Sequence, residues 1–273
     1  MNKEQIVQQV MEQLQAQKKA PAAAPPKTNS PVGITDIANS IYGSCSLTEY
    51  VGCHPFGDSI GMVIANMDPA LHKLLNIPEQ YRSLGIITAR SGAGPHAMAA
   101  DEAVKSCNVE LVRFEQSNDT KGGGGHGNMM LFGAEEVSDA RRAVEITLQG
   151  LDWAFGGVIG NPNTFIEVQY TARASNVLAK YLKAELGRAW ALINGCPAGI
   201  SVLMSDAALK SADVKLTGYG SPENGVGFTN EFTTFITGDS GAVKTAVQTA
   251  REVGIKLMRT LGEDPKPTGR EYF

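Results

Sequence analysis

The residue types that could do chemistry gather in the glycine-rich segment 119–127, which reads DTKGGGGHG. Backbone N–H groups freed by glycine can cradle an anion, and Lys121 and His126 add a cation and a titratable ring. However, the chain has no GxxxxGK[ST] phosphate loop, and no GxGxxG opens a helix after a strand. Anion binding, a plain surface loop and a polar lining all remain open for this segment.

Catalysis finds little support in the same residues. His126 has no Ser, Cys or carboxylate partner that the sequence places within reach, so we predict no catalytic residue and no enzyme activity. The other histidines, His54, His72 and His96, are most simply surface or cap residues.

The cysteines give no sign of a metal site. Cys45, Cys53, Cys107 and Cys196 form no CxxC pair and have no His at metal-ligand spacing. This pattern predicts neither a bound metal nor a disulfide framework, and favours buried or idle thiols.

The elements that must position these residues come in two copies. The stretch AGPHAMAADEAVKSCNVEL at 93–111 is repeated as AGISVLMSDAALKSADVKL at 198–216, so that Asp101 matches Asp206 and Lys105 matches Lys210. The same spacing of 105 positions carries Val63 onto Val168. A period of this length is a whole domain rather than a solenoid repeat.

The sequence of each copy predicts four strands, together with helices that follow strands. Apolar residues alternate, or run together, in segments that suit strands, and recur near a period of 3.6 in segments that suit helices. The expected strands are 60–64, 84–89, 109–114 and 129–132 in the first copy and 166–170, 189–193, 214–219 and 232–237 in the second. The expected helices are 96–106, 137–151 and 243–257. The order favours an α+β fold with one sheet covered by helices.

Composition excludes two partner classes. The net charge is −4 without a basic patch in either half, which argues against nucleic-acid binding. No apolar run approaches the roughly 18 residues of a membrane span, and the polar start has no signal-peptide core, so we expect a chain that stays inside the cell.

Outside the two copies lie three further segments. Residues 1–17 carry Ile6, Val10, Met11 and Leu14 at helical spacing among polar residues, which predicts a short amphipathic helix. Residues 18–44 form a linker that begins rich in Ala and Pro, and 263–273, with two prolines and a glycine, is expected to be a surface tail. The repeats then occupy 45–156 and 157–262.

The ordered motifs resemble a known family. LGI followed by AADEAVKSCNVEL, then DTKGGGGHG, VQYTARAS and TGDSGAVK, are similar to the shell-protein domain of bacterial microcompartments. Because the strand at 62–66 precedes the rest in both copies, the chain resembles the circularly permuted tandem-domain type found in propanediol- and ethanol-utilisation compartments. The resemblance covers about 45–262. It implies two ferredoxin-like domains, each with a four-stranded antiparallel sheet, and a homotrimer that forms a six-sided tile of the compartment shell.

By the same resemblance, both glycine loops face the central axis of the tile. The expected lining for small polar metabolites is Asp119, Lys121, Gly122, Gly123, Gly124, Gly125, His126, Asn224, Gly225, Gly227 and Phe228. Some tandem shell proteins hold an iron–sulfur cluster there through loop cysteines. Neither loop of this chain contains a cysteine, so we expect no cofactor.

The resemblance also assigns the tile edge and a tether. Lys105, Lys210 and Arg173 match positions that contact neighbouring tiles, whereas Asp68 stands opposite Arg173 in the first copy. The lysines could equally close a helix and complement its dipole.

A helix of about 15 residues is marginal alone, so we expect residues 1–17 to dock on encapsulated enzymes, although a disordered solubilising tail also fits. The competing function is a duplicated ferredoxin-like regulatory protein that binds an anionic metabolite.

Overall fold

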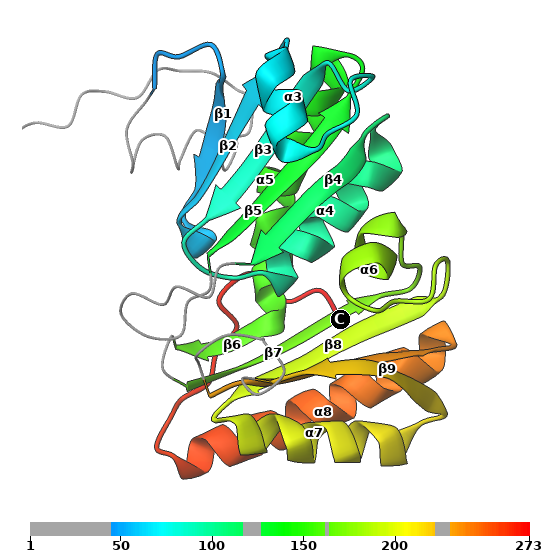
Figure 1. The fold of residues 1–273 in the computed structure, drawn as a ribbon. Helices are drawn as coiled ribbons and strands as arrows, with labels where there is room; N and C mark the ends of the chain where they lie inside the picture. The colour runs from blue at the N-terminus through cyan, green and yellow to red at the C-terminus, as the bar shows by residue number, and fades with distance from the viewer. Residues whose placement is uncertain (1–44, 117–126, 162–163, 222–229) are drawn as a thin grey trace, which may run out of the picture. The chain divides into compact units, whose positions relative to one another are not determined.

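A computed structural model describes residues 45–116, 127–161, 164–221 and 230–273. These residues form two α+β repeats, each with one five-stranded antiparallel sheet and helices packed against it (Figure 1). The duplication seen in the sequence is therefore a duplication of the fold.

The first repeat has its strands in the order β1-β2-β3-β5-β4. Its elements are β1 (Tyr50–His54), β2 (Ser59–Ile64), α3 (Pro69–Leu75), β3 (Ser83–Ala89), α4 (Gly94–Ser106), β4 (Glu110–Gln116), β5 (Asn128–Ala134) and α5 (Val137–Ala154). Helices α4 and α5 pack against each other, and α5 covers β2 and β3.

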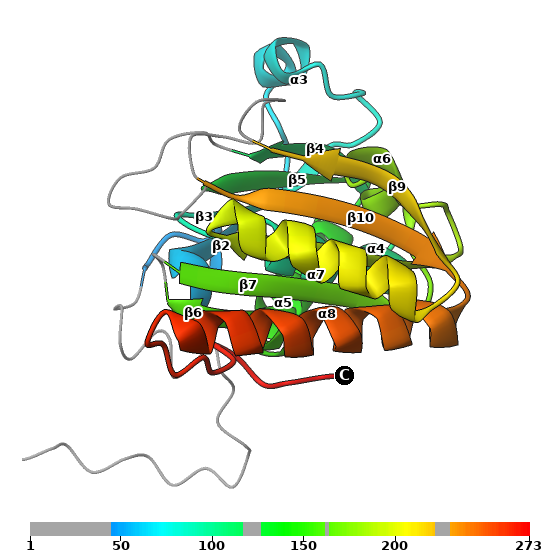
Figure 2. The same cartoon turned by 90° about the horizontal axis from the view of Figure 1, so that it is seen from below.

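The second repeat has the same order, β6-β7-β8-β10-β9. Its elements are β6 (Val158–Asn161), β7 (Thr164–Thr171), α6 (Asn176–Tyr181), β8 (Ala189–Cys196), α7 (Ala198–Ser211), β9 (Val214–Gly220), β10 (Phe232–Gly238) and α8 (Ser240–Thr260). Figure 2 shows α7 and α8 side by side along one face of this sheet.

Each sheet has one strand more than the four expected. The additional strands are β1, which pairs with β2, and β6, which pairs with β7. Both strands are short and contain glycine, with the sequences YVGCH in β1 and VIGN in β6. Neither sequence therefore shows the clear alternation of apolar and polar residues that predicts a strand. Two short helices, α3 and α6, were also not expected; a side-chain cap begins each, from Asp68 and Ser175 respectively.

The long helices confirm the helical periodicity. In α5 four residues of the predicted stripe, Ala140, Val144, Leu148 and Leu151, are buried, with at most 2% of each residue exposed, whereas Val137 at its start is 37% exposed. In α8 the equivalent stripe begins at Val243 and is buried through its first turns. A helix with one apolar stripe must bury it against another element, and here both stripes face a sheet.

One apolar cluster extends across both repeats. It joins Met98 and Leu111 of the first repeat to Leu178 and Trp190 of the second. The indole of Trp190 is fully buried and donates to the Leu182 carbonyl at 3.1 Å, which satisfies its polar atom. The two repeats therefore share part of their core.

The C-terminal segment 263–273 differs from the expected surface tail. Pro267 bridges to Ile159 at the edge of the second sheet, and the Thr268 N–H donates to the Val158 carbonyl at 2.8 Å. The hydroxyl of Tyr272 donates to Gln169 Oε1 at 2.9 Å. This segment is thus part of the folded structure, which a proline-rich composition did not reveal.

Within the part of the chain that the structure describes, none of the helices combines the length and the apolar character needed to cross a membrane.

Candidate functional site: the seam between the repeats

The expected lining of the opening lies outside the described residues, as do the tether residues Ile6, Val10, Met11 and Leu14. The strand ends that lead into both glycine loops are described. Gln116 pairs with Asn128 at the end of β4 and β5, and Gly220 pairs with Thr233 at the end of β9 and β10. Figure 2 shows both strand ends on the same side. The lining itself remains a prediction.

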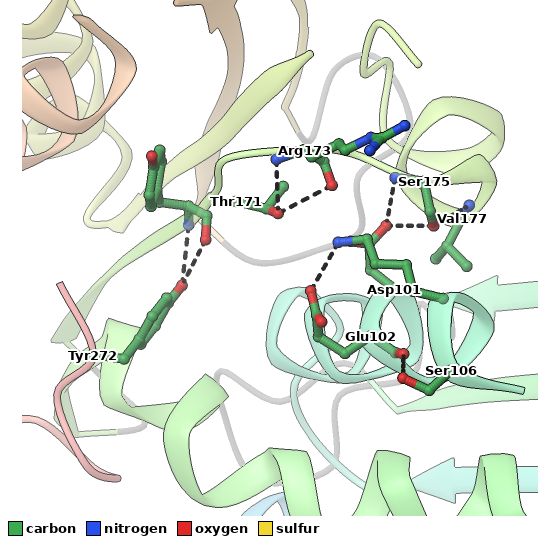
Figure 3. Close-up of polar contacts among 10 residues, drawn as sticks. Asp101, Glu102, Ser106, Thr171, Arg173, Ser175, Val177 and Tyr272 are labelled. Atoms are coloured by element: carbon green, nitrogen blue, oxygen red, sulfur yellow. Dashed lines mark hydrogen bonds and ion pairs between the residues drawn. The ribbon is translucent and has the colours of Figure 1, made fainter. Parts of the chain in front are cut away.

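Two of the three expected edge residues lie on elements that meet at the seam between the repeats. Lys105 lies on α4 of the first repeat, and Arg173, labelled in Figure 3, lies just before α6 of the second. Asp101, one turn before Lys105, contacts the lysine: Asp101 Oδ2 lies 2.6 Å from Lys105 Nζ. Spacing of four residues on a helix places these two side chains on one face.

Asp101 is fully buried and holds the start of α6. Its Oδ1 accepts from the Ser175 backbone N–H at 2.9 Å and from the Ser175 hydroxyl at 2.5 Å. Ser175 is also the N-cap of α6, because its hydroxyl oxygen accepts from the Val177 N–H at 3.3 Å. This carboxylate thus ties α4 of the first repeat to the start of α6 in the second (Figure 3).

The charge state of Lys105 follows from this geometry. Its ammonium also contacts Glu102 at 2.8 Å. Burial would lower the pKa of Lys105, but the hydrogen bonds and charges of Asp101 and Glu102 outweigh burial and raise the pKa above its ordinary value. Lys105 therefore stays charged and neutralises the buried Asp101.

The equivalent pair in the second repeat is open to solvent. Lys210 Nζ lies 2.7 Å from Asp206 Oδ2, with 75% of the lysine side chain and 51% of the aspartate side chain exposed. The sequence motif is the same, but no described element covers it as the second repeat covers Asp101.

Arg173 points outward and makes no ion pair with any described residue. Its backbone N–H donates to Thr171 Oγ1 at 3.3 Å.

The helix caps correct one detail of the repeat alignment: Asp68 is the counterpart of Ser175, since both begin the helix that follows the second strand. The pairing of Asp68 with Arg173 was therefore wrong, and no acidic residue replaces the arginine at its own position.

A second polar network crosses the same seam. Gln169 donates to Glu167 Oε1 at 2.9 Å and to the Ala154 carbonyl at 3.0 Å, and accepts from Tyr272. Glu167 is buried directly against Gly94 at the start of α4, where a methyl group would collide with the carboxylate. The pKa of Glu167 is raised to about 7: burial is the main cause, the Gln169 hydrogen bond opposes the shift, and the nearby charge of Glu231 adds to it.

The histidines correct another expectation, since His54, His72 and His96 are buried rather than surface residues. His96 Nε2 lies 2.7 Å from the Ser59 hydroxyl, which itself donates to the Phe56 carbonyl. Burial, followed by repulsion from His54, lowers the pKa of His96 to about 3. A neutral ring fixed between a hydroxyl and the Phe155 ring is a core residue, and its partner Ser59 is 37 positions away, which hid the pair in the sequence.

The sequence repeat singled out Asp101 but did not show what Asp101 does. Matching Asp101 to Asp206 indicated a shared structure, whereas the burial of Asp101 alone depends on the docking of the second repeat.

Among the described residues, no group of three or more His, Cys, Asp or Glu side chains is arranged to hold a metal ion. The four cysteines are free, with Cys45 exposed and the others partly buried.

The seam joins two copies of one fold, and comparison with known proteins names that fold. The BMC domain model matches residues 83–160 and 189–262, beginning at β3 and at β8. The chain belongs to the BMC-domain family. It is a structural shell protein of a bacterial microcompartment. In this BMC-domain chain β1 and β2 precede the first matched segment, and β7 lies between the two segments, as in a permuted domain.

The relatives of this BMC-domain chain are bacterial microcompartment shell proteins. Bacterial microcompartment shell protein PduB of Salmonella typhimurium is 49% identical over all of both chains. PduB of Limosilactobacillus reuteri is 44% identical over 85% of this chain and 96% of its own length.

Two solved structures share the fold of both repeats. A trimeric PduB covers 83% of this chain and 100% of its own, with 44% identity and a TM-score of 0.79. EtuB from Clostridium kluyveri covers 84% of this chain and 100% of its own, with 47% identity and a TM-score of 0.80.

Proposed function

We propose that this shell protein forms homotrimers, which tile with neighbouring shell proteins as six-sided units. The observation that carries the proposal is the seam: two BMC domains already dock side by side through Asp101 and Ser175. A trimer of such pairs places six domains around one axis, and the trimeric relative supports this number.

Native mass spectrometry and negative-stain electron microscopy test the proposal. We expect trimers of the 29.0 kDa chain, and flat plates or sheets at higher concentration. Isolated particles without sheets, together with monomers in the mass spectrum, would contradict it. They would favour the duplicated regulatory protein instead, for which the family membership gives no support.

The second part of the proposal is passage or binding of small polar metabolites at the tile. The strand ends beside Gln116 and Gly220 lead into both glycine loops on one side of the fold, and a trimer would bring such loops from several chains to the axis. Donors and acceptors along 119–127 and 221–228 suit a diol, glycerol, an alcohol or an aldehyde.

Soaking crystals in glycerol or 1,2-propanediol locates such a site. Ordered ligand at the loops or at a subunit boundary is the expected result. Ligand found only far from both would contradict the assignment of the loops.

The third part of the proposal is the tether. Each large apolar side chain in the stripe of residues 1–17 would contribute roughly 1.5 to 3 kcal/mol if a partner buried it. The Ala- and Pro-rich linker that follows would hold this segment away from the tile.

Deletion of residues 1–30 tests the tether in whole compartments. We expect shells that assemble with this shell protein in place but retain less of the encapsulated enzyme. Equal co-purification of enzyme with truncated and complete chains would contradict the tether.

A further inference from the structure

Glu167 places an acid without a cation inside the seam. The residue is 7% exposed, and its carboxylate lies against Gly94 at the start of α4, on the first repeat. Among the described residues, this carboxylate accepts one hydrogen bond, from Gln169 at 2.9 Å, and forms no ion pair. An ionised carboxylate has about four acceptor positions, and leaving them without donors away from water costs free energy.

The first repeat shows that the fold does not require an acid at this position. The half-buried Ile60 faces Thr88 across β2 and β3 as Glu167 faces Asn194 across β7 and β8. The spacing of 107 positions between Ile60 and Glu167 also separates the N-caps of α3 and α6. A buried acid at a position where the fold accepts isoleucine is an exception to apolar packing, and such exceptions are expected at functional positions.

A second buried acid adds to the unfavourable charge. Asn194 donates through Nδ2 to Glu231 Oε2 at 3.2 Å, and its Oδ1 accepts from the Gly195 N–H at 2.7 Å. Glu231 is 4% exposed, and its negative charge opposes the ionisation of Glu167. The amide that faces Glu167 across the strands is therefore directed at the second acid.

The groups that act on Glu167 favour its protonated form on balance. Burial favours the neutral acid most strongly, the Gln169 amide opposes it, and Glu231 adds to it, so that the pKa of Glu167 is raised to about 7. The N-terminal end of α4 also favours an anion, and Ala93 gives that end no side-chain cap.

The other titratable groups on the elements around Glu167 do not neutralise it. Strands β6 and β8 carry no charged side chain. Burial lowers the pKa of His96 to about 3 and raises that of Tyr272, so both are neutral. The charged side chains of α4, α5 and the C-terminal segment have neighbours of their own or face solvent: Asp101 with Lys105, Asp152 near His54, Glu271 with Arg251, and the exposed Glu102 and Arg270.

We infer that the contact between Glu167 and Gly94 is a proton-sensitive joint, which is closed while Glu167 is protonated and opens to water when Glu167 ionises. The freed carboxylate finds its missing donors in water and in the first N–H groups of α4. Gly92, with a φ of 79°, lies two residues before α4 and lets the chain there change direction. The inference concerns each chain by itself and does not depend on the proposed trimer.

Other contacts hold the repeats together while this joint opens. Asp101 binds Ser175 at the start of α6, and the apolar cluster around Trp190 spans both repeats. The opening is therefore a local event that leaves the rest of the seam in place.

Proton linkage gives the sign and the size of the effect. The closed joint holds the pKa of Glu167 at about 7, and the open joint returns it toward the ordinary value of 4.5. Protons thus favour the closed joint, so the open population rises with pH between these two values and levels off above pH 7. From pH 6 to pH 8 the open population should rise about tenfold.

Hydrogen exchange of the full chain, followed by mass spectrometry at pH 6 and pH 8, tests the joint. Labelling times are scaled to the intrinsic exchange rate at each pH and kept short enough that the buried turns 243–250 of α8 stay protected. We expect the protection of 97–103 and 164–170 to fall about tenfold from pH 6 to pH 8 within these times. Exchange of both segments only when 243–250 also exchanges would contradict the inference, because the seam would then open by unfolding alone.

Three substitutions decide whether Glu167 is responsible. Glu167→Gln stays neutral at both pH values, and Glu167→Ile supplies the residue of the first repeat, so both should lose the tenfold response. Glu252→Gln, at an exposed position of α8, should keep it. A response that persists in Glu167→Gln or, where that variant does not fold, in Glu167→Ile would assign the titration to another group and overturn the inference. Equal protection of the unmodified chain at both pH values would overturn it as well.

Discussion

Asp101 and Asp206 show how much one docking event changes an ion pair. Each carboxylate lies four residues before a lysine and contacts it at 2.6 or 2.7 Å. Exposed pairs of this kind contribute little, about 0 to 1 kcal/mol, whereas removing one partner of a buried pair is costly. The repeat therefore uses one motif for a solvated helix face and for a structural anchor.

Substitution of Asp101 should destabilise the chain strongly. Asp101→Asn removes the charge that neutralises Lys105 and weakens both bonds to Ser175, and we expect a loss of roughly 2 to 4 kcal/mol. Urea unfolding followed by tryptophan fluorescence measures it. Glu102→Gln is the control, because it leaves the Asp101 pair intact and should cost less than about 1 kcal/mol. Equal losses in both variants would contradict the anchoring role.

Glu167 predicts a specific pH dependence. Its pKa in the folded chain is about 7, above the ordinary value of 4.5. Below pH 4.5 Glu167 is protonated in both the folded and the unfolded chain, so it does not make the free energy of unfolding depend on pH there. Between pH 4.5 and 7 only the folded chain holds it, so stability falls as pH rises, by on the order of 3 kcal/mol in total.

Glu167→Gln should remove this fall, and the variant should be more stable than the unmodified chain at pH 8. Unfolding midpoints between pH 5 and 8 provide the measurement. The exposed Glu252→Gln should keep the slope of the unmodified chain. A Glu167→Gln variant that retains the full slope would show that another group titrates.

At the scale of elements, the apolar periodicity of the sequence predicted the helices and strands whose pattern is set within one segment of the chain. The stripes of α5 and α8 and the core strands were readable because each repeats an apolar residue at a fixed interval. The edge strands β1 and β6 and the burial of His96 were not readable, because they depend on partners elsewhere in the chain. The same limit hid the seam, where Asp101 and Ser175 are 74 positions apart.

The C-terminal segment is the clearest element of this second kind. It continues the sheet edge at Ile159 and reaches the buried network through Tyr272. The Tyr272 ring also packs on Trp153 at 4.9 Å between centroids, so the segment ties the end of α5 to β7.

Two substitutions of Tyr272 separate its packing from its hydrogen bond. Tyr272→Phe keeps the ring and loses the bond that the hydroxyl donates to Gln169 and the one it accepts from the Tyr170 N–H, which should cost about 1 kcal/mol for each bond. Tyr272→Ala loses the ring as well, and should cost roughly 3 to 5 kcal/mol. Thermal unfolding of both variants checks the order. A Tyr272→Ala variant as stable as Tyr272→Phe would mean that the segment does not pack in solution.

At the scale of the whole molecule, the expected tile edge can be separated from the internal seam. Lys105 serves the seam through Asp101, so Lys105→Ala alone confuses stability with assembly. Lys210 is exposed and holds only Asp206 among the described residues, so its removal is cleaner.

Lys210→Ala should leave the unfolding midpoint within about 0.5 kcal/mol of the unmodified chain, as is usual at exposed sites. If the lysine contacts neighbouring tiles, trimers should persist while sheets in electron micrographs become rare, and adding Lys105→Ala should abolish them. Lys256→Ala, an exposed lysine on α8, should form sheets as the unmodified chain does. Sheets of normal order from the double variant would contradict the edge assignment, because the remaining contacts would then be sufficient without either lysine.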